Sequence, residues 1–128
     1  MKIEKTNREL DVMLGAIRAI AADKLSLPAK VGYLLAKNRI ALENALKPYK
    51  ESYEGIVKKY ASGGETSFRI NKDEEPEKFS EVTKAITEIG DEMTSADLTP
   101  ISIDALDGHD IPFRYIDALT DILKDGEG

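Results

Sequence analysis

The only histidine of the chain, His109, lies in the stretch "DGHD" among the acidic residues Asp104, Asp107 and Asp110. An imidazole beside carboxylates could hold a metal ion or transfer protons. No second histidine or regular ligand spacing accompanies it, and the acids do not follow the alternating pattern of a calcium loop. The stretch is more typical of a solvent-facing turn that precedes a last helix, and we expect no metal there.

Other catalytic patterns are absent from the sequence. It has no cysteine and a single histidine, so it lacks the nucleophile–base pairs of covalent catalysis. The glycines of "SGGE" follow a helical pattern and lack the lysine and hydroxyl of a phosphate-binding loop. The acids of "DEEPEKFSE" and "EIGDEM" are typical of helix caps and solvated helix flanks. We therefore expect a protein that is not an enzyme and has no cofactor.

Charge is distributed unevenly along the chain, whose net charge is −6. Residues 24–60 carry a balance of +5 and residues 61–128 a balance of −11. Lys30 and Lys37 fall on one side of the expected helix in the basic segment, and with Asn38 they could bind a small anionic nucleotide in an oligomer. A solvated helix face is the simpler interpretation. Nucleic-acid binding is disfavoured because aromatic residues do not alternate with the lysine and arginine residues.

Asn38 lies in "YLLAKNRIAL", between the apolar positions Leu34 and Leu42 of the same helical pattern. Its amide is therefore expected to be buried and to hydrogen-bond to backbone, either in the helical hairpin or in the segment 98–103. A structural role of this kind, fixing helix register, is favoured over contact with a ligand or partner.

Apolar spacing predicts a mainly α fold in one domain over residues 1–128. Helices over 7–23 and from about 28 to 60 form a hairpin (7–60), a linker covers 61–75, a third helix spans 76–93, and 94–124 form a short extended segment and a last helix. The third helix is expected to complete a three-helix core, with Met93 on its apolar stripe. Pro48 predicts a kink in the second helix.

Short strands are predicted near 2–4, 67–70 and 98–103, and two or three of them are expected to meet as a small ribbon. In the last helix, Phe113, Ile116, Leu119, Ile122 and Leu123 are expected to face inward.

Four residues extend the apolar stripe of the second helix beyond the reach of the first: Tyr49, Tyr53, Ile56 and Tyr60. Large rings with a polar tip favour protein–protein contact. We expect this part of the stripe to bind a protein partner or a second copy of the chain.

The stretches "LPAKVGYLLAKNRIALENALKPY" and "PISIDAL…IPFRYIDALTDIL", with the helix between them, make the chain resemble small tailed-bacteriophage proteins of unknown function. The resemblance covers most of the chain in outline and carries no catalytic residues. It implies an accessory or virion-associated protein in the virion or the cytoplasm of a bacterial host. The expected function is protein–protein contact, as an assembly component or as an inhibitor of a host protein, and no apolar run is long enough to cross a membrane.

Overall fold

The computed structural model describes residues 1–23, 27–60, 76–106 and 111–124, and it is mainly α-helical, as predicted. The elements in chain order are β1 (Lys2–Thr6), α1 (Asn7–Ala22), α2 (Ala29–Tyr60), α3 (Pro76–Gly90), β2 (Met93–Asp97), β3 (Ile101–Ser102), the 3-10 turn η1 (Ile103–Leu106), α4 (Phe113–Ala118), the 3-10 turn η2 (Thr120–Ile122) and β4 (Leu123–Lys124). The predicted linker 61–75 and the strand expected near 67–70 lie outside the described residues. None of the helices in the described part of the chain is long and apolar enough to cross a membrane.

The start of α1 is set by a capping box. The Glu9 backbone N–H donates to Thr6 Oγ1, and the Thr6 N–H donates to Glu9 Oε1, both at 3.2 Å. These bonds satisfy two of the backbone donors that a helix start leaves free. The carboxylate that accepts from Thr6 is held ionised, so the pKa of Glu9 is lowered from its ordinary value.

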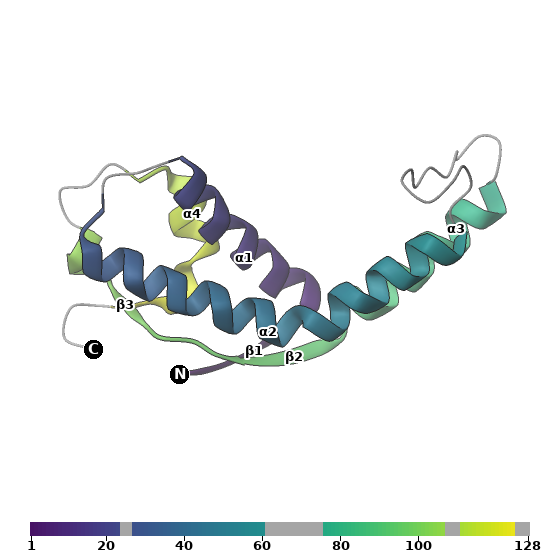
Figure 1. Cartoon of the computed structure of the whole chain (residues 1–128), viewed down its shortest axis with the longest axis horizontal. Helices are drawn as coiled ribbons and strands as arrows, with labels where there is room; N and C mark the ends of the chain where they lie inside the picture. Colours follow the sequence, from purple (N-terminus) through teal and green to yellow (C-terminus); the bar gives the residue numbers. More distant parts are fainter. Residues whose placement is uncertain (24–26, 61–75, 107–110, 125–128) are drawn as a thin grey trace.

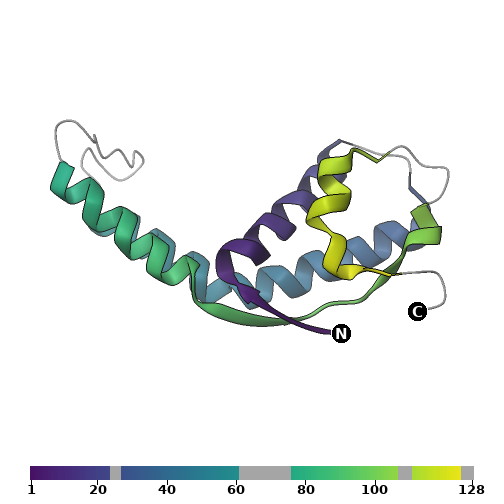
Figure 2. The same ribbon diagram turned by 180° about the vertical axis from the view of Figure 1, so that it is seen from behind.

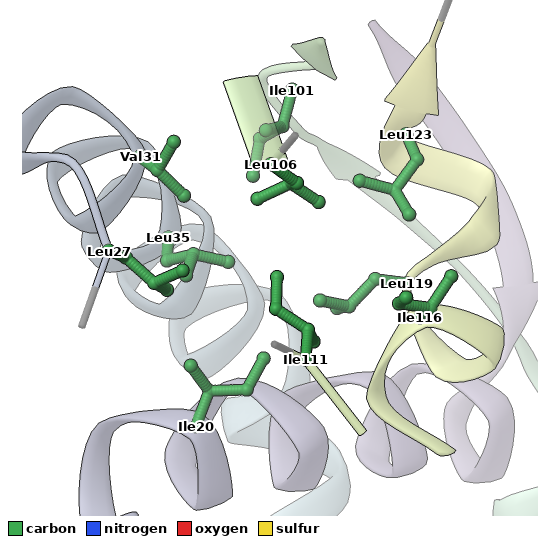
Figure 3. A pocket seen from close by; sticks show the side chains of 10 residues that line it. All are labelled: Ile20, Leu27, Val31, Leu35, Ile101, Leu106, Ile111, Ile116, Leu119 and Leu123. Carbon is green, nitrogen blue, oxygen red and sulfur yellow. The ribbon is translucent and has the colours of Figure 1, made fainter. Parts of the chain in front are cut away.

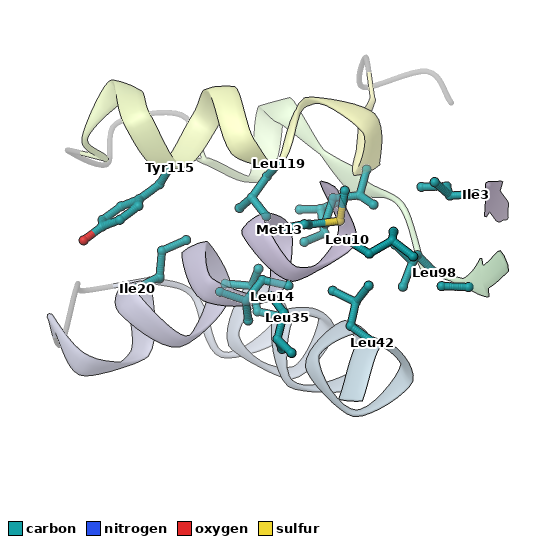
Figure 4. Close-up of a cluster of buried hydrophobic side chains, with 14 of the residues drawn as sticks. Ile3, Leu10, Met13, Leu14, Ile20, Leu35, Leu42, Leu98, Tyr115 and Leu119 are labelled. Atoms are coloured by element: carbon teal, nitrogen blue, oxygen red, sulfur yellow. The ribbon is translucent and has the colours of Figure 1, made fainter. Parts of the chain in front are cut away.

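The body of the protein is formed by β1, α1, the first part of α2 and the C-terminal segment, which comprises the described residues 93–106 and 111–124 (Figures 1 and 2). Its core gathers apolar side chains from α1, α2 and the C-terminal segment (Figure 4). Leu10, Leu42 and Ile122 have no exposed surface, and Leu98 and Ile101 are almost as well covered. Burial of a side chain of this size stabilises a fold by about 1.5–3 kcal/mol.

The third layer of this core differs from the prediction. The helix expected to complete it, α3, contributes no side chain to the core cluster, whose third side comes instead from Leu98, Ile101, Tyr115, Leu119 and Ile122. α3 packs along the distal part of α2. The reason is that α1 already occupies the proximal part, so α2 is covered by one helix over each half of its length.

The arm consists of residues 51–60 of α2 together with α3, and it projects from the body as a two-helix extension (Figures 1 and 2). α2 continues through Pro48, and its ribbon bends where the body gives way to the arm (Figure 1). Such a bend is expected where proline removes one backbone N–H from a helix, in agreement with the predicted kink.

The end of the third helix was predicted wrongly. α3 ends at Gly90, and Met93 begins strand β2 with 62% of its surface exposed. β2 runs antiparallel to β1, with Ile3 opposite Ala96. Pairing with β1 supplies the backbone hydrogen bonds that a longer helix would have supplied, so the apolar spacing that continued to Met93 was misleading.

The C-terminal segment also departs from the expected single helix. α4 ends at Ala118 and gives way to η2 and then to β4, which pairs in parallel with β3. Leu119 and Ile122 face inward as predicted, but Phe113 is 78% exposed and Ile116 is exposed too. Tyr115 is buried in their place, and its hydroxyl donates to the Asp23 carboxylate at the end of α1.

Candidate functional site

The described residues contain no cluster of three or more acidic or histidine side chains that could hold a metal ion. His109, Asp107 and Asp110 lie outside the described residues, and Asp104 is exposed in η1. The prediction of a chain without a catalytic or metal centre therefore remains a prediction.

Asn38 is fully buried in the middle of α2. Its Nδ2 donates to the Thr99 carbonyl at 2.9 Å, and its Oδ1 accepts from the Thr99 N–H at 2.7 Å. Thr99 lies between β2 and β3, and the amide gives its backbone N–H and carbonyl the pair of hydrogen bonds that a neighbouring strand would otherwise provide. The predicted burial, and the predicted backbone partner in segment 98–103, are both confirmed, and both ends of the amide are occupied.

The alternative anion site is not assembled by this fold. Lys30 and Lys37 are exposed on the outer side of α2, whereas Asn38 faces the core without any exposed surface. A ligand held by the two lysines could not reach the amide. Consecutive residues of an α-helix point in directions about 100° apart, which explains why adjacency of Lys37 and Asn38 in the sequence does not bring their side chains together.

The candidate protein-binding residues do lie along one part of α2. Tyr49 and Tyr53 meet edge to face, with ring centroids 6.3 Å apart. Tyr49 is half-buried at the base of the arm, Tyr53 is 40% exposed, and Ile56 is half-buried. Tyr60 ends the helix, and its side chain lies outside the described set.

The arm seam, as we define it, comprises the apolar side chains on the facing stripes of its two helices: Tyr53, Ile56, Val57, Phe79, Val82 and Ile86. Val82 alone among them is buried, at 8% exposure, and the others retain part of their surface. In the body, a third layer closes over the helices; in the described part of the arm, no third layer does. The arm seam is therefore apolar surface covered from one side.

Partial burial also affects the ionisation of Tyr49, which lies where the arm meets the body. Burial raises the pKa of the Tyr49 phenol above its ordinary value, and the nearby Asp11 carboxylate acts in the same direction. Asp11 itself pairs with Lys50 at 2.7 Å, and the Lys50 ammonium lies 5.9 Å from the centre of the Tyr49 ring. This cluster joins α1 to α2 at the level where the arm begins.

Sequence reasoning missed the residue that joins the arm to the body, Asn7. It is buried at the start of α1, where its Nδ2 donates to the Ile89 carbonyl at 2.8 Å and its Oδ1 accepts from the Thr94 hydroxyl at 2.5 Å. The Asn7 N–H donates to the Glu92 carbonyl at 2.9 Å. One side chain thus ties α1 to both the end of α3 and strand β2. Its place beside a capping threonine was the sole sequence signal, and that signal also fits an ordinary helix start.

Two hollows lie near the α1–α2 connection. A small cavity of about 20 Å³ is lined entirely by aliphatic side chains, which come from α1, from Leu27 ahead of α2, from α2 itself and from the C-terminal segment (Figure 3). A groove of about 400 Å³ opens between the end of α1 and the start of α2. Ile20, Leu27 and Leu35 line both hollows and separate one from the other.

Comparisons with protein-family models, with curated proteins and with solved structures gave no match for this chain.

Proposed function

We propose that this chain is a non-enzymatic interaction protein that binds another protein through its α2–α3 arm. The observation that carries the proposal is the arm seam, whose apolar and tyrosine side chains on α2 and α3 have no third layer over them in the described part of the arm. Helices in folded proteins gain most of their stability from packing of their apolar face. A partner that supplied the missing third layer would bury this surface and stabilise both molecules.

The composition of the arm seam supports a protein as the occupant. Aromatic residues, and tyrosine in particular, are enriched at interfaces because a large apolar ring carries a polar hydroxyl that tolerates both water and contact. Tyr53 combines these properties with 40% exposure near the base of the arm. The resemblance to small phage proteins fits a partner in a virion, in an assembly pathway or in the host cell.

Affinity capture from a bacterial lysate tests the proposal. Wild-type protein is compared with a Tyr53→Ser, Ile56→Ser variant and with a Tyr33→Ser control, whose tyrosine is 65% exposed on the body part of the same helix. The wild type and the control should retain the same captured protein, and the double variant should lose it. Equal capture by all three proteins, or none by the wild type, would contradict the proposal.

Self-association is the special case in which the partner is a second copy. Size-exclusion chromatography with light scattering at tens of micromolar distinguishes it, because the double variant should then become monomeric while Tyr33→Ser stays associated. A strict monomer for the wild type would reject self-association and leave a different protein as the proposed partner.

A further inference from the structure

The groove between α1 and α2 is separate from the arm and has the dimensions of a ligand site. It has a volume of about 400 Å³, within the range of small-molecule pockets. Along α2 it extends from Ala29 to Arg39, which at the helical rise of 1.5 Å per residue is about 15 Å. It is therefore elongated along α2, as a site for a single extended chain would be.

The walls of the groove are apolar and are kept apart by small residues. Ile17 and Ile20 of α1 form one side, and Gly32 and Ala36 of α2 form the other. A Cβ atom added at Gly32 would meet nothing within 4 Å, so the space over this glycine is open. An apolar chain placed there would contact aliphatic carbon along its length.

One end of the groove carries positive charge. Arg39 is the single charged side chain among the described residues that line it. Its Nη1 pairs with Glu43 Oε1 at 2.6 Å, and Arg18 Nη2 pairs with the other oxygen of the same carboxylate at 3.0 Å. Two guanidinium groups thus share one carboxylate, and each has further N–H donors available for a second anion.

We propose that this groove binds a single-chain alkyl carboxylate, with the alkyl chain along Ile17, Ile20, Gly32 and Ala36 and the carboxylate at the Arg39–Arg18 end. The surplus positive charge at one end and the aliphatic walls along the rest match the two halves of such a molecule. A neutral alkyl chain would fill the groove but leave the surplus charge without a partner.

The experiment is an NMR titration of the full chain with decanoate, with decanol as the uncharged probe. Decanoate should bind saturably and shift the backbone amides of residues 17–21 and 28–39. Decanol should bind about tenfold more weakly, because it lacks the charge-assisted bond to Arg39. Arg39→Gln should remove that difference.

The matched variants are Gly32→Leu, which places a side chain in the groove, and Gly15→Leu, which adds the same side chain at an exposed helical glycine of α1 with equally open surroundings. Gly32→Leu should weaken decanoate binding about tenfold or more without lowering the melting temperature, because leucine favours a helix over glycine. Gly15→Leu should bind like the wild type. Ala36→Leu is the second groove-filling variant if Gly32→Leu does not fold.

Three results would overturn the proposal. These are no saturable binding of decanoate by the wild type, undiminished binding by a folded groove-filling variant, and equal affinity for decanoate and decanol. The first two reject the site and the third rejects the carboxylate as the recognised group. None of them bears on the arm, which these variants leave unchanged.

Discussion

Asn38 links the middle of α2 to the backbone of Thr99, sixty-one positions further along the chain. The link is a pair of hydrogen bonds that occupies both ends of the Asn38 amide. The sequence was sufficient to predict this kind of contact, because an amide on an apolar helical stripe must find buried partners. It was insufficient to identify Thr99, since that choice depends on how the segment between β2 and β3 crosses the helix. The role of Asn7 was not predicted for the same reason, because its side-chain partners Ile89 and Thr94 are also distant in the sequence.

Replacing Asn38 with leucine should leave the protein folded but less stable by about 2–4 kcal/mol, because the Thr99 N–H and carbonyl both lose their partner. Urea unfolding followed by circular dichroism measures the change. Asn44→Leu, at an exposed position of the same helix, is the control and should stay close to wild type.

Asn38→Asp separates the two hydrogen bonds. The carboxylate still accepts from the Thr99 N–H, but it opposes the Thr99 carbonyl and is buried, so the pKa of this carboxyl in the folded state should lie above that in the unfolded chain. Stability is then present below the unfolded pKa and lost as the pH rises through the folded pKa. The variant should approach wild-type stability on moving from pH 7 to pH 4.5; a gap that does not narrow would show that the pKa of this carboxyl is not raised, in conflict with a buried position opposite the Thr99 carbonyl.

The Tyr49 phenol should ionise above its ordinary pKa of 10.0, because partial burial disfavours the phenolate and the Asp11 charge opposes it. A raised folded pKa means that this contribution to stability is complete below pH 10.0 and is lost as the pH rises through the folded value. Ultraviolet titration of wild type and Tyr49→Phe isolates the phenol. If the missing transition is centred at or below pH 10.0, the base of the arm is more open to water than the structure implies.

The elements were predicted best where apolar spacing is strong and contacts are local. The Thr6 capping box and the apolar face of α1 follow directly from the sequence. Gly90 marks the end of α3, and glycine is a common helix terminator. This end was nevertheless missed, because the apolar spacing beyond it continued to Met93 by chance. The inward face of α4 was missed because Tyr115, whose hydroxyl donates to Asp23, takes the buried position that was expected for Phe113.

Asn7→Ala should loosen the joint between arm and body. The Ile89 carbonyl and the Thr94 hydroxyl both lose a partner, at a cost of about 1–3 kcal/mol. Hydrogen exchange by mass spectrometry should show faster exchange in α3 and β2 than in the wild type, with α4 unchanged. Asn44→Ala is the matched control, and uniform acceleration over the whole chain by Asn7→Ala would indicate a general loss of stability instead of a local joint.

The whole molecule combines a body with a layered core and an arm that is two helices thick. Sequence periodicity identified the helices but could not show that α1 and α3 divide the length of α2 between them, because that arrangement depends on contacts between distant segments. The excess of negative charge in residues 61–128 likewise does not predict how the segments are arranged, because acids on α3 and acids on the C-terminal segment contribute to the same total.

This difference in thickness should produce two levels of local stability. Amides of α1 and of the body part of α2 should exchange only through global unfolding, whereas those of α3 should exchange through a smaller opening that leaves the body folded. Native-state hydrogen exchange at increasing urea resolves the two classes. A single class with one free energy of opening would show that arm and body unfold as a unit.

The measurement that tests the central claim most directly is site-specific photo-crosslinking in living bacteria that produce the protein. Tyr53 in the arm seam and Tyr33 on the body part of α2 are each replaced by p-benzoylphenylalanine, so the same crosslinker is compared at two exposed positions of one helix. The account predicts one dominant protein adduct from position 53 and none of comparable yield from position 33. The same diffuse adducts from both positions, or no adduct from position 53, would contradict a protein-binding arm.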